Sequence, residues 1–148
     1  MFRFENKPIS SNIARFKIYI EKTENYDIAG ILYNSTYGIA IDFLGIRQML
    51  SCLDEFFDYV NFPQATHEKR SFIEELDKKE KYPPRWLRVV VPEEMQDKQP
   101  IFLLHVQFRQ NATWQGTLEL ISEGKTERFR SELEMIELIA GTLKKIKI

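Results

Sequence analysis

The feature that most constrains the fold of this chain is an internal repeat. Residues 16–57 align without a gap with residues 102–143, an offset of 86 positions, and seven of these 42 pairs are identical. Most of the remaining apolar positions also coincide, and one of the identical pairs joins Gly30 with Gly116. Self-similarity at one fixed spacing indicates a duplicated structural unit. The sequence therefore predicts two copies of the same small unit in tandem.

Each copy is predicted to begin with β-strands, because apolar and polar residues alternate in its first part. In the strand at 102–109, the predicted inward face consists of Phe102, Leu104, Val106 and Phe108. The predicted outward face of the same strand consists of Leu103, His105, Gln107 and Arg109. The strands are predicted at 2–5, 15–21, 27–33 and 38–42 in the first copy, and at 86–91, 102–109, 114–120 and after the turn at 123–124 in the second.

Each copy is predicted to end in an amphipathic helix. From residue 43 onward, apolar residues recur at three- and four-residue spacing, and this pattern ends near Pro63. Ser131 and Glu134 have the spacing of a capping box, which predicts the start of the second helix. The segment between the copies is rich in Lys and Glu and is expected to carry a helix of its own.

These elements predict an α+β fold class in which a ββββα unit is repeated in tandem within one domain. The first repeat spans residues 1–62, the charged and helical linker spans 63–85, and the second repeat spans 86–148. The antiparallel strands are expected to form either two four-stranded sheets or one continuous sheet, with a pseudo-two-fold axis between the repeats. Both long helices are expected to pack on one face.

Composition excludes several classes of protein. The chain has 21 basic and 22 acidic residues, so it lacks the global positive field of a strongly basic nucleic-acid binder. Its single cysteine, Cys52, has no partner for an internal disulfide, which indicates a reducing compartment. The first residues contain no apolar signal segment, and no apolar run is long enough to span a membrane. A cytoplasmic location without membrane association is therefore expected.

No residue cluster indicates a reaction, and no cofactor or metal site is predicted. The two histidines, His67 and His105, have no second His or Cys at ligand spacing, so surface or structural roles are expected. Cys52 is expected to be a small semi-buried hydrophobic residue of the first helix rather than a nucleophile. Glycine-rich phosphate loops, metalloprotease helices and nucleophile elbows do not occur, so the chain is not expected to be an enzyme.

The outward faces of the predicted strands are the candidate binding surface. In the first copy this face includes Lys17, Tyr19, Ile31 and Tyr33, which combine rings with a cation. Rings can stack on bases while cations meet phosphates, which suits single-stranded nucleic acid. The same aromatic and aliphatic side chains would equally suit burial against a second subunit or a partner protein.

A second group of polar residues surrounds the predicted hairpin of the second copy. Arg109, Gln115, Arg128 and Arg130 are candidate contacts for an anionic ligand, because they concentrate positive charge around that hairpin. Taken together, the predicted ligand-binding residues are Lys17, Tyr19, Tyr33, Arg109, Gln115 and Arg128.

These patterns carry two resemblances. The order ββββα–linker–ββββα resembles that of the purine-rich-element-binding repeat proteins and the Whirly proteins, whose curved sheets bind single-stranded nucleic acid. The similarity is one of element order, so none of their binding residues is carried over. Separately, FRQNATWQG at 108–116 and FRSELE at 129–134 resemble segments of short uncharacterised proteins from clostridial-type bacterial genomes. That resemblance implies a bacterial cytoplasmic origin and brings no known activity.

The sequence therefore predicts a non-catalytic binding or assembly module of a bacterial cytoplasm, acting through an open antiparallel sheet surface. Its expected partner is another protein, or a second copy of the chain in a homodimer. The alternative partner is single-stranded DNA or RNA.

Overall fold

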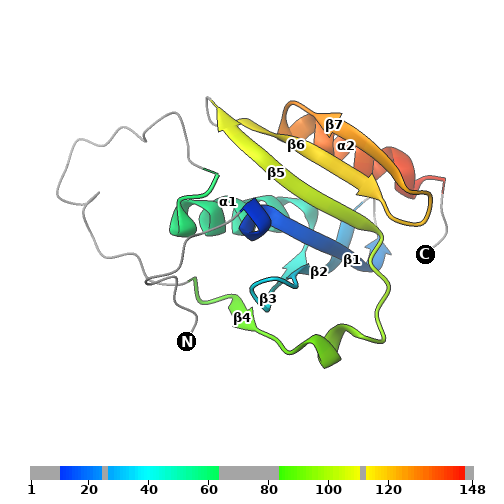
Figure 1. Cartoon of the computed structure of the whole chain (residues 1–148). Helices are drawn as coiled ribbons and strands as arrows, with labels where there is room; N and C mark the ends of the chain where they lie inside the picture. Colours follow the sequence, from blue (N-terminus) through cyan, green and yellow to red (C-terminus); the bar gives the residue numbers. More distant parts are fainter. Residues whose placement is uncertain (1–10, 25–26, 64–83, 111–112, 146–148) are drawn as a thin grey trace.

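Strands and helices follow one another in the same order in both halves of the chain (Figure 1). The computed structural model describes residues 11–24, 27–63, 84–110 and 113–145. The first half contains η1 (Ser11–Ala14), β1 (Arg15–Glu24), β2 (Asp27–Asn34), β3 (Ile39–Leu44) and α1 (Ile46–Val60). The second half contains β5 (Phe102–Gln110), β6 (Thr113–Leu120), β7 (Lys125–Phe129) and α2 (Glu132–Leu143). Between the halves lie β4 (Leu87–Val89) and the 3₁₀ turn η3 (Pro92–Met95).

The described strands form one seven-stranded antiparallel sheet with the order β4-β3-β2-β1-β5-β6-β7. The two halves join where β1 pairs with β5, so they form one continuous sheet rather than two. The prediction of an α+β fold with antiparallel strands is confirmed. The strand predicted at 86–91 is present as β4, but it pairs with β3 at the edge of the first half. The strand predicted at 2–5 and the helix predicted in the linker lie outside the described residues.

The main hydrophobic core contains side chains from the sheet and from both helices. The strands contribute alternate residues, such as Phe16 of β1 and Phe102 of β5. α1 contributes six buried residues, as its three- and four-residue spacing predicts, whereas α2 contributes Met135 and Ile139. In the view of Figure 1, β1 crosses in front of α1, and β6 and β7 lie in front of α2. We call the side of the sheet that faces away from this core the outer face.

A β-bulge interrupts each of the two central strands at the same relative position. The register shifts at residue 21 in β1 and at residue 107 in β5. A glycine lies opposite each bulge, and a Cβ at Gly30 or Gly116 would overlap a carbonyl oxygen of the neighbouring strand. Glycine at these two positions therefore leaves room for the carbonyl group of the adjacent strand.

The bulge in β5 reverses the alternation of side chains in the rest of the strand. One extra residue turns every following side chain to the other face. Phe108 is consequently 49% exposed on the outer face, and Arg109 is 5% exposed on the side of the core. The prediction that Phe108 faces inward and Arg109 faces outward is therefore wrong.

Side chains satisfy backbone donors at the start of both helices. Ser131 Oγ accepts a hydrogen bond from the Glu134 N–H at 3.2 Å, which confirms the first bond of the predicted capping box. The Glu134 carboxylate accepts its bond from the Arg130 N–H at 3.0 Å, one residue before the position that a capping box uses. At the start of α1, the Asp27 carboxylate accepts a hydrogen bond from the Ile46 N–H at 2.8 Å. The Ser131 and Asp27 side chains thus satisfy N–H groups that have no partner within the helix, and the Asp27 bond also ties the start of α1 to β2.

Candidate binding face of the sheet

The outer face of the first half is covered by the chain itself. A second buried cluster consists of Tyr19, Ile31, Tyr33, Ala40, Val90 and Met95. Its last two members belong to the connection between β4 and β5, which packs across the two tyrosine rings. Burial, and to a smaller extent the neighbouring Tyr33, raises the pKa of Tyr19. The expectation that Tyr19 and Tyr33 present open rings on the sheet surface is therefore wrong.

The Arg109 side chain of β5 binds the C-terminal end of α1, and we call this residue the clamp. Its guanidinium donates hydrogen bonds to the carbonyl oxygens of Pro63 at 2.5 Å and Phe57 at 3.2 Å. It also pairs with the Asp58 carboxylate at 2.8 Å and lies 5.7 Å from the centre of the Phe57 ring. The last carbonyl groups of a helix lack partners within it and favour a nearby positive charge. Each of the three guanidinium nitrogens of Arg109 therefore donates a hydrogen bond within the chain.

The open part of the outer face carries a polar row that crosses four strands. Arg15 of β1 lies opposite His105 of β5, and His105 lies opposite Thr117 of β6. Thr117 in turn lies opposite Arg128 of β7. Directly paired residues of an antiparallel sheet point to the same face. With neighbouring strands about 4.8 Å apart, the backbones of the two arginines are about 14 Å apart. We call these four residues the cationic row.

Further side chains of the same face lie beside the cationic row. Lys17 follows Arg15 by two residues and lies opposite Leu103, and the exposed ring of Phe108 lies opposite Gln115. The face thus combines cations, a hydroxyl group, an amide group and a phenyl ring with the carboxylate of Glu119, which lies opposite Leu103 and two residues from Thr117 on β6. Of the predicted ligand-binding residues, the structure brings together Lys17, Gln115 and Arg128 on this face, and it places Tyr19, Tyr33 and Arg109 elsewhere.

The cations of this face form no ion pair with the Glu119 carboxylate or with any other described carboxylate. Within the described ranges, Arg15, Lys17 and Arg128 take part in no ion pair. Arg88, by contrast, lies on the outer face of the first half and pairs with Asp42 at 2.7 Å. Because Arg15, Lys17 and Arg128 outnumber the Glu119 carboxylate, this face has a positive local potential although the whole chain is nearly neutral.

His105 lies within the cationic row and is almost buried. Its pKa is lowered, chiefly because burial disfavours the charged form and also because Arg15 carries a positive charge beside it. The ring is therefore neutral at pH 7, so one of its nitrogens donates a hydrogen bond and the other accepts one. An anion bound beside the ring would favour the protonated form and raise this pKa.

The remaining reactive side chains are placed as follows. Cys52 is buried in the core, and burial together with the nearby Glu55 raises the pKa of its thiol, which disfavours the reactive thiolate. Among the residues that the structure describes, no group of three or more His, Cys, Asp or Glu side chains is placed to hold a metal ion. None of the described helices is long and apolar enough to cross a membrane. His67 lies outside the described residues.

Four residues of the open face are missing from the predicted ligand-binding residues, namely Arg15, His105, Thr117 and Phe108. Arg15 begins an alternating segment whose next residue, Phe16, faces the core, so the same alternation would have identified it as outward-facing. Phe108 gives no such signal, because its apolar side chain fits the inward pattern and a bulge leaves no clear mark in a single sequence.

The chain matches no protein-family model, no curated protein and no solved structure. Its function therefore has to be inferred from the face itself.

Proposed function

We propose that the protein is a non-catalytic binding module that holds single-stranded nucleic acid on the open part of its outer face. The cationic row carries this proposal, because two arginines without ion-pair partners flank a histidine and a hydroxyl group across four neighbouring strands. A polymer with one negative charge per unit matches cations spread over a broad face better than a single small anion does.

The residues of the face have distinct roles in this proposal. Arg15, Lys17 and Arg128 contact phosphates, and the planar guanidinium groups can do so with two hydrogen bonds each. Phe108 offers a ring on which a base stacks, and Gln115 beside it offers an amide group to the edge of that base. Because most of these contacts involve the phosphates, only a weak preference for base sequence is expected.

We further infer that the two halves arose by tandem duplication and have since diverged. In support of this, the bulges at residues 21 and 107 and the helix starts at Ile46 and Glu132 all differ by 86 positions. Contributions of both helices to one core accord with their packing on one face. Residues 90–95 cover the outer face of the first half, so binding is assigned to β1 and the second half.

A protein partner is the second candidate, and a different surface supports it. Beside the β4 edge of the sheet, Leu44 is 80% exposed, and Val89 and Val91 are more than half exposed. Large apolar side chains next to a terminal strand suit pairing with a strand of another protein or of a second copy of the chain. A homodimer formed at this edge would leave the cationic row free.

Fluorescence anisotropy of labelled single-stranded DNA and RNA, titrated with the protein at two salt concentrations, tests the proposed function. Binding is expected to weaken steeply with salt, because phosphate contacts release counterions. Arg128→Gln is expected to weaken binding about tenfold, the effect of losing one charged hydrogen bond of about 1.5 kcal/mol, and to reduce the salt dependence. Arg47→Gln removes the same charge from the exposed side of α1 and is the matched control.

Two results would contradict the proposal. One is the absence of binding to either oligonucleotide at low salt, and the other is an equal loss of affinity in Arg128→Gln and Arg47→Gln. The molar mass measured by light scattering separates the two candidates. A dimer without nucleic-acid affinity would support assembly through the β4 edge instead.

A further inference from the structure

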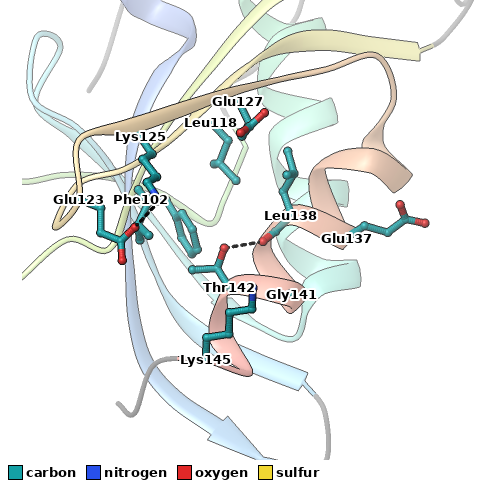
Figure 2. Close-up of a pocket in the computed structure, with 11 residues that line it drawn as sticks. Phe102, Leu118, Glu123, Lys125, Glu127, Glu137, Leu138, Gly141, Thr142 and Lys145 are labelled. Atoms are coloured by element: carbon teal, nitrogen blue, oxygen red, sulfur yellow. Dashed lines mark hydrogen bonds and ion pairs between the residues drawn. The ribbon is translucent and has the colours of Figure 1, made fainter.

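A pocket of about 420 Å³ lies between α2 and strands β6 and β7, on the core side of the sheet (Figure 2). Its apolar lining consists of Phe102, Leu118, Leu120 and Leu138. Charged side chains also line it, namely Glu123, Lys125, Glu127, Glu137 and Lys145. This volume is in the range of small-molecule sites, which are about 300–1,000 Å³. The pocket and the cationic row lie on opposite sides of the sheet.

The corresponding space in the first half is filled by an aromatic ring. At the 86-residue offset, Thr142 of the pocket corresponds to Phe56 of α1, and Phe102 corresponds to Phe16. Phe56 is fully buried and packs edge-on against Phe16, with ring centres 5.6 Å apart and an interplanar angle of 85°. In the second half a threonine stands where this ring would be, and so the equivalent side of Phe102 borders the pocket.

The strand residues at the pocket also differ between the halves: they are apolar and buried in the first half and charged in the second. Lys125 and Glu127 of β7 correspond to Ile39 and Ile41 of β3, which are both fully buried. A filled apolar space in the first half thus corresponds, in the second, to an open space with an apolar base and charged walls. That combination is typical of a site for a small molecule that is partly apolar and partly charged.

The charges around the pocket favour a cation. Lys125 is engaged with Glu123 at 3.3 Å, which leaves Glu127, Glu137 and Lys145. Within the part of the chain that the structure describes, neither of these two glutamates takes part in an ion pair. Lys145 takes part in no ion pair among the described residues either, so the three glutamates and two lysines of the lining carry a net charge of −1.

We propose that this pocket binds a small molecule that carries one aromatic ring and a positively charged amine. The ring packs edge-on against Phe102, as the ring of Phe56 packs against Phe16, a favourable geometry for aromatic pairs. The ammonium group lies at Glu127 of β7, because the side chain of Glu137 extends from α2 away from Phe102 (Figure 2). This site is independent of the nucleic-acid face, and it adds a ligand that the proposed function does not require.

Chemical-shift mapping on the isotope-labelled full chain tests the proposal with three probes. 2-Phenylethylamine has both required groups, 3-phenylpropionate has the ring with a negative charge, and butylamine has the amine without a ring. 2-Phenylethylamine is expected to bind at least about tenfold more tightly than either of the others, a difference of about 1.4 kcal/mol. The shifts are expected at the amides of residues that line the pocket.

Variants at position 142 supply the matched comparison. Thr142→Phe places in the second half the ring that the first half has at position 56, and it is expected to abolish binding of 2-phenylethylamine. Thr142→Val has nearly the volume of the natural residue, leaves the pocket open and is expected to retain binding. If Thr142→Phe does not fold, Gly141→Leu fills the pocket from a neighbouring position where an added Cβ meets nothing within 4 Å.

The outcomes distinguish the parts of the proposal. Absence of shifts at the pocket with 2-phenylethylamine, or unchanged binding in the folded filling variant, would overturn it. Equal affinity for 2-phenylethylamine and 3-phenylpropionate would overturn the assignment of a cationic ligand. Glu127→Gln is expected to remove the preference for the amine while ring binding remains.

Discussion

Replacement of Arg109 by methionine tests whether this residue is a structural clamp or a ligand contact. Methionine keeps an unbranched apolar side chain in the site but removes all donors. The carbonyl oxygens of Phe57 and Pro63 then lose hydrogen bonds from a residue that is only 5% exposed. The Asp58 carboxylate also loses its ion pair with Arg109, but this side chain is 37% exposed and water can solvate it.

The expected cost follows from these three contacts. A hydrogen bond from a charged donor contributes about 1.5–3 kcal/mol, and a buried acceptor left without a partner costs about 1–3 kcal/mol. The pair with Asp58 adds little, because that carboxylate is partly solvated. We therefore expect Arg109→Met to lower the free energy of unfolding by about 3 kcal/mol. For a domain of this length, each kcal/mol corresponds to about 2–4 °C, so the Tm is expected to fall by about 6–12 °C.

Urea unfolding followed by tryptophan fluorescence measures this cost, with Arg128→Met as the control. Arg128 is exposed on β7, and its replacement is expected to change stability by less than about 0.5 kcal/mol. Oligonucleotide affinity provides the opposite readout: it is expected to fall in Arg128→Met and to remain unchanged in folded Arg109→Met. Loss of affinity in Arg109→Met without loss of stability would refute the clamp and would restore Arg109 as a ligand contact.

Three further predictions concern the backbone, a helix cap and pH. Gly116→Ala is expected to lower the free energy of unfolding in urea by about 3 kcal/mol, because the added Cβ meets a backbone oxygen. Gly141→Ala is expected to raise it by about 0.5–1 kcal/mol, because a Cβ there meets nothing within 4 Å. Equal effects of the two variants would contradict the bulge geometry. Ser131→Ala is expected to cost about 1 kcal/mol by removing the cap of α2, and an unchanged Tm would contradict this. The lowered pKa of His105 means that the unfolded chain binds more protons than the folded chain below about pH 6.5, so stability is expected to fall as the pH decreases from 7 to 5. His105→Gln is expected to flatten this dependence, and an unchanged pH profile would contradict it.

Local patterns predict the strands and helices of this chain well, for a physical reason. The alternation in β1 and the three- and four-residue spacing in α1 follow directly from which side chains are excluded from water. The capping box of Ser131 and Glu134 is equally local, because three residues suffice to form it. The pairing of β1 with β5 joins residues more than 80 positions apart, and no periodicity within either strand specifies it.

The candidate site is less predictable because two non-local features decide which side chains are open. The extra residue in β5 reverses the direction of Phe108 and Arg109, and its effect is invisible in a pattern that fits a regular strand. Residues 90–95 cover Tyr19 and Tyr33. Pro92 and Pro100 indicate that this connection is a loop, but they do not indicate where the loop packs. The predicted residues that lie together on the open face, such as Lys17 and Arg128, are those whose position neither feature alters.

On both sides of the sheet, the second half is open where the first half is closed. On the outer face, Tyr19 lies under the β4–β5 connection, whereas His105 at the equivalent position belongs to the cationic row. On the core side, Phe56 fills a space that Thr142 at the equivalent position leaves open. If the two sides bind two separate ligands, a substitution on one side should change the affinity for one ligand and leave the affinity for the other unchanged. Thr142→Phe is expected to stabilise the protein by about 0.5–2 kcal/mol, as cavity filling commonly does, and to leave oligonucleotide affinity unchanged. Arg128→Gln is expected to weaken oligonucleotide binding while amine binding and the Tm stay the same. A variant that altered both affinities in a fully folded protein would show that the two sides of the sheet are coupled rather than independent.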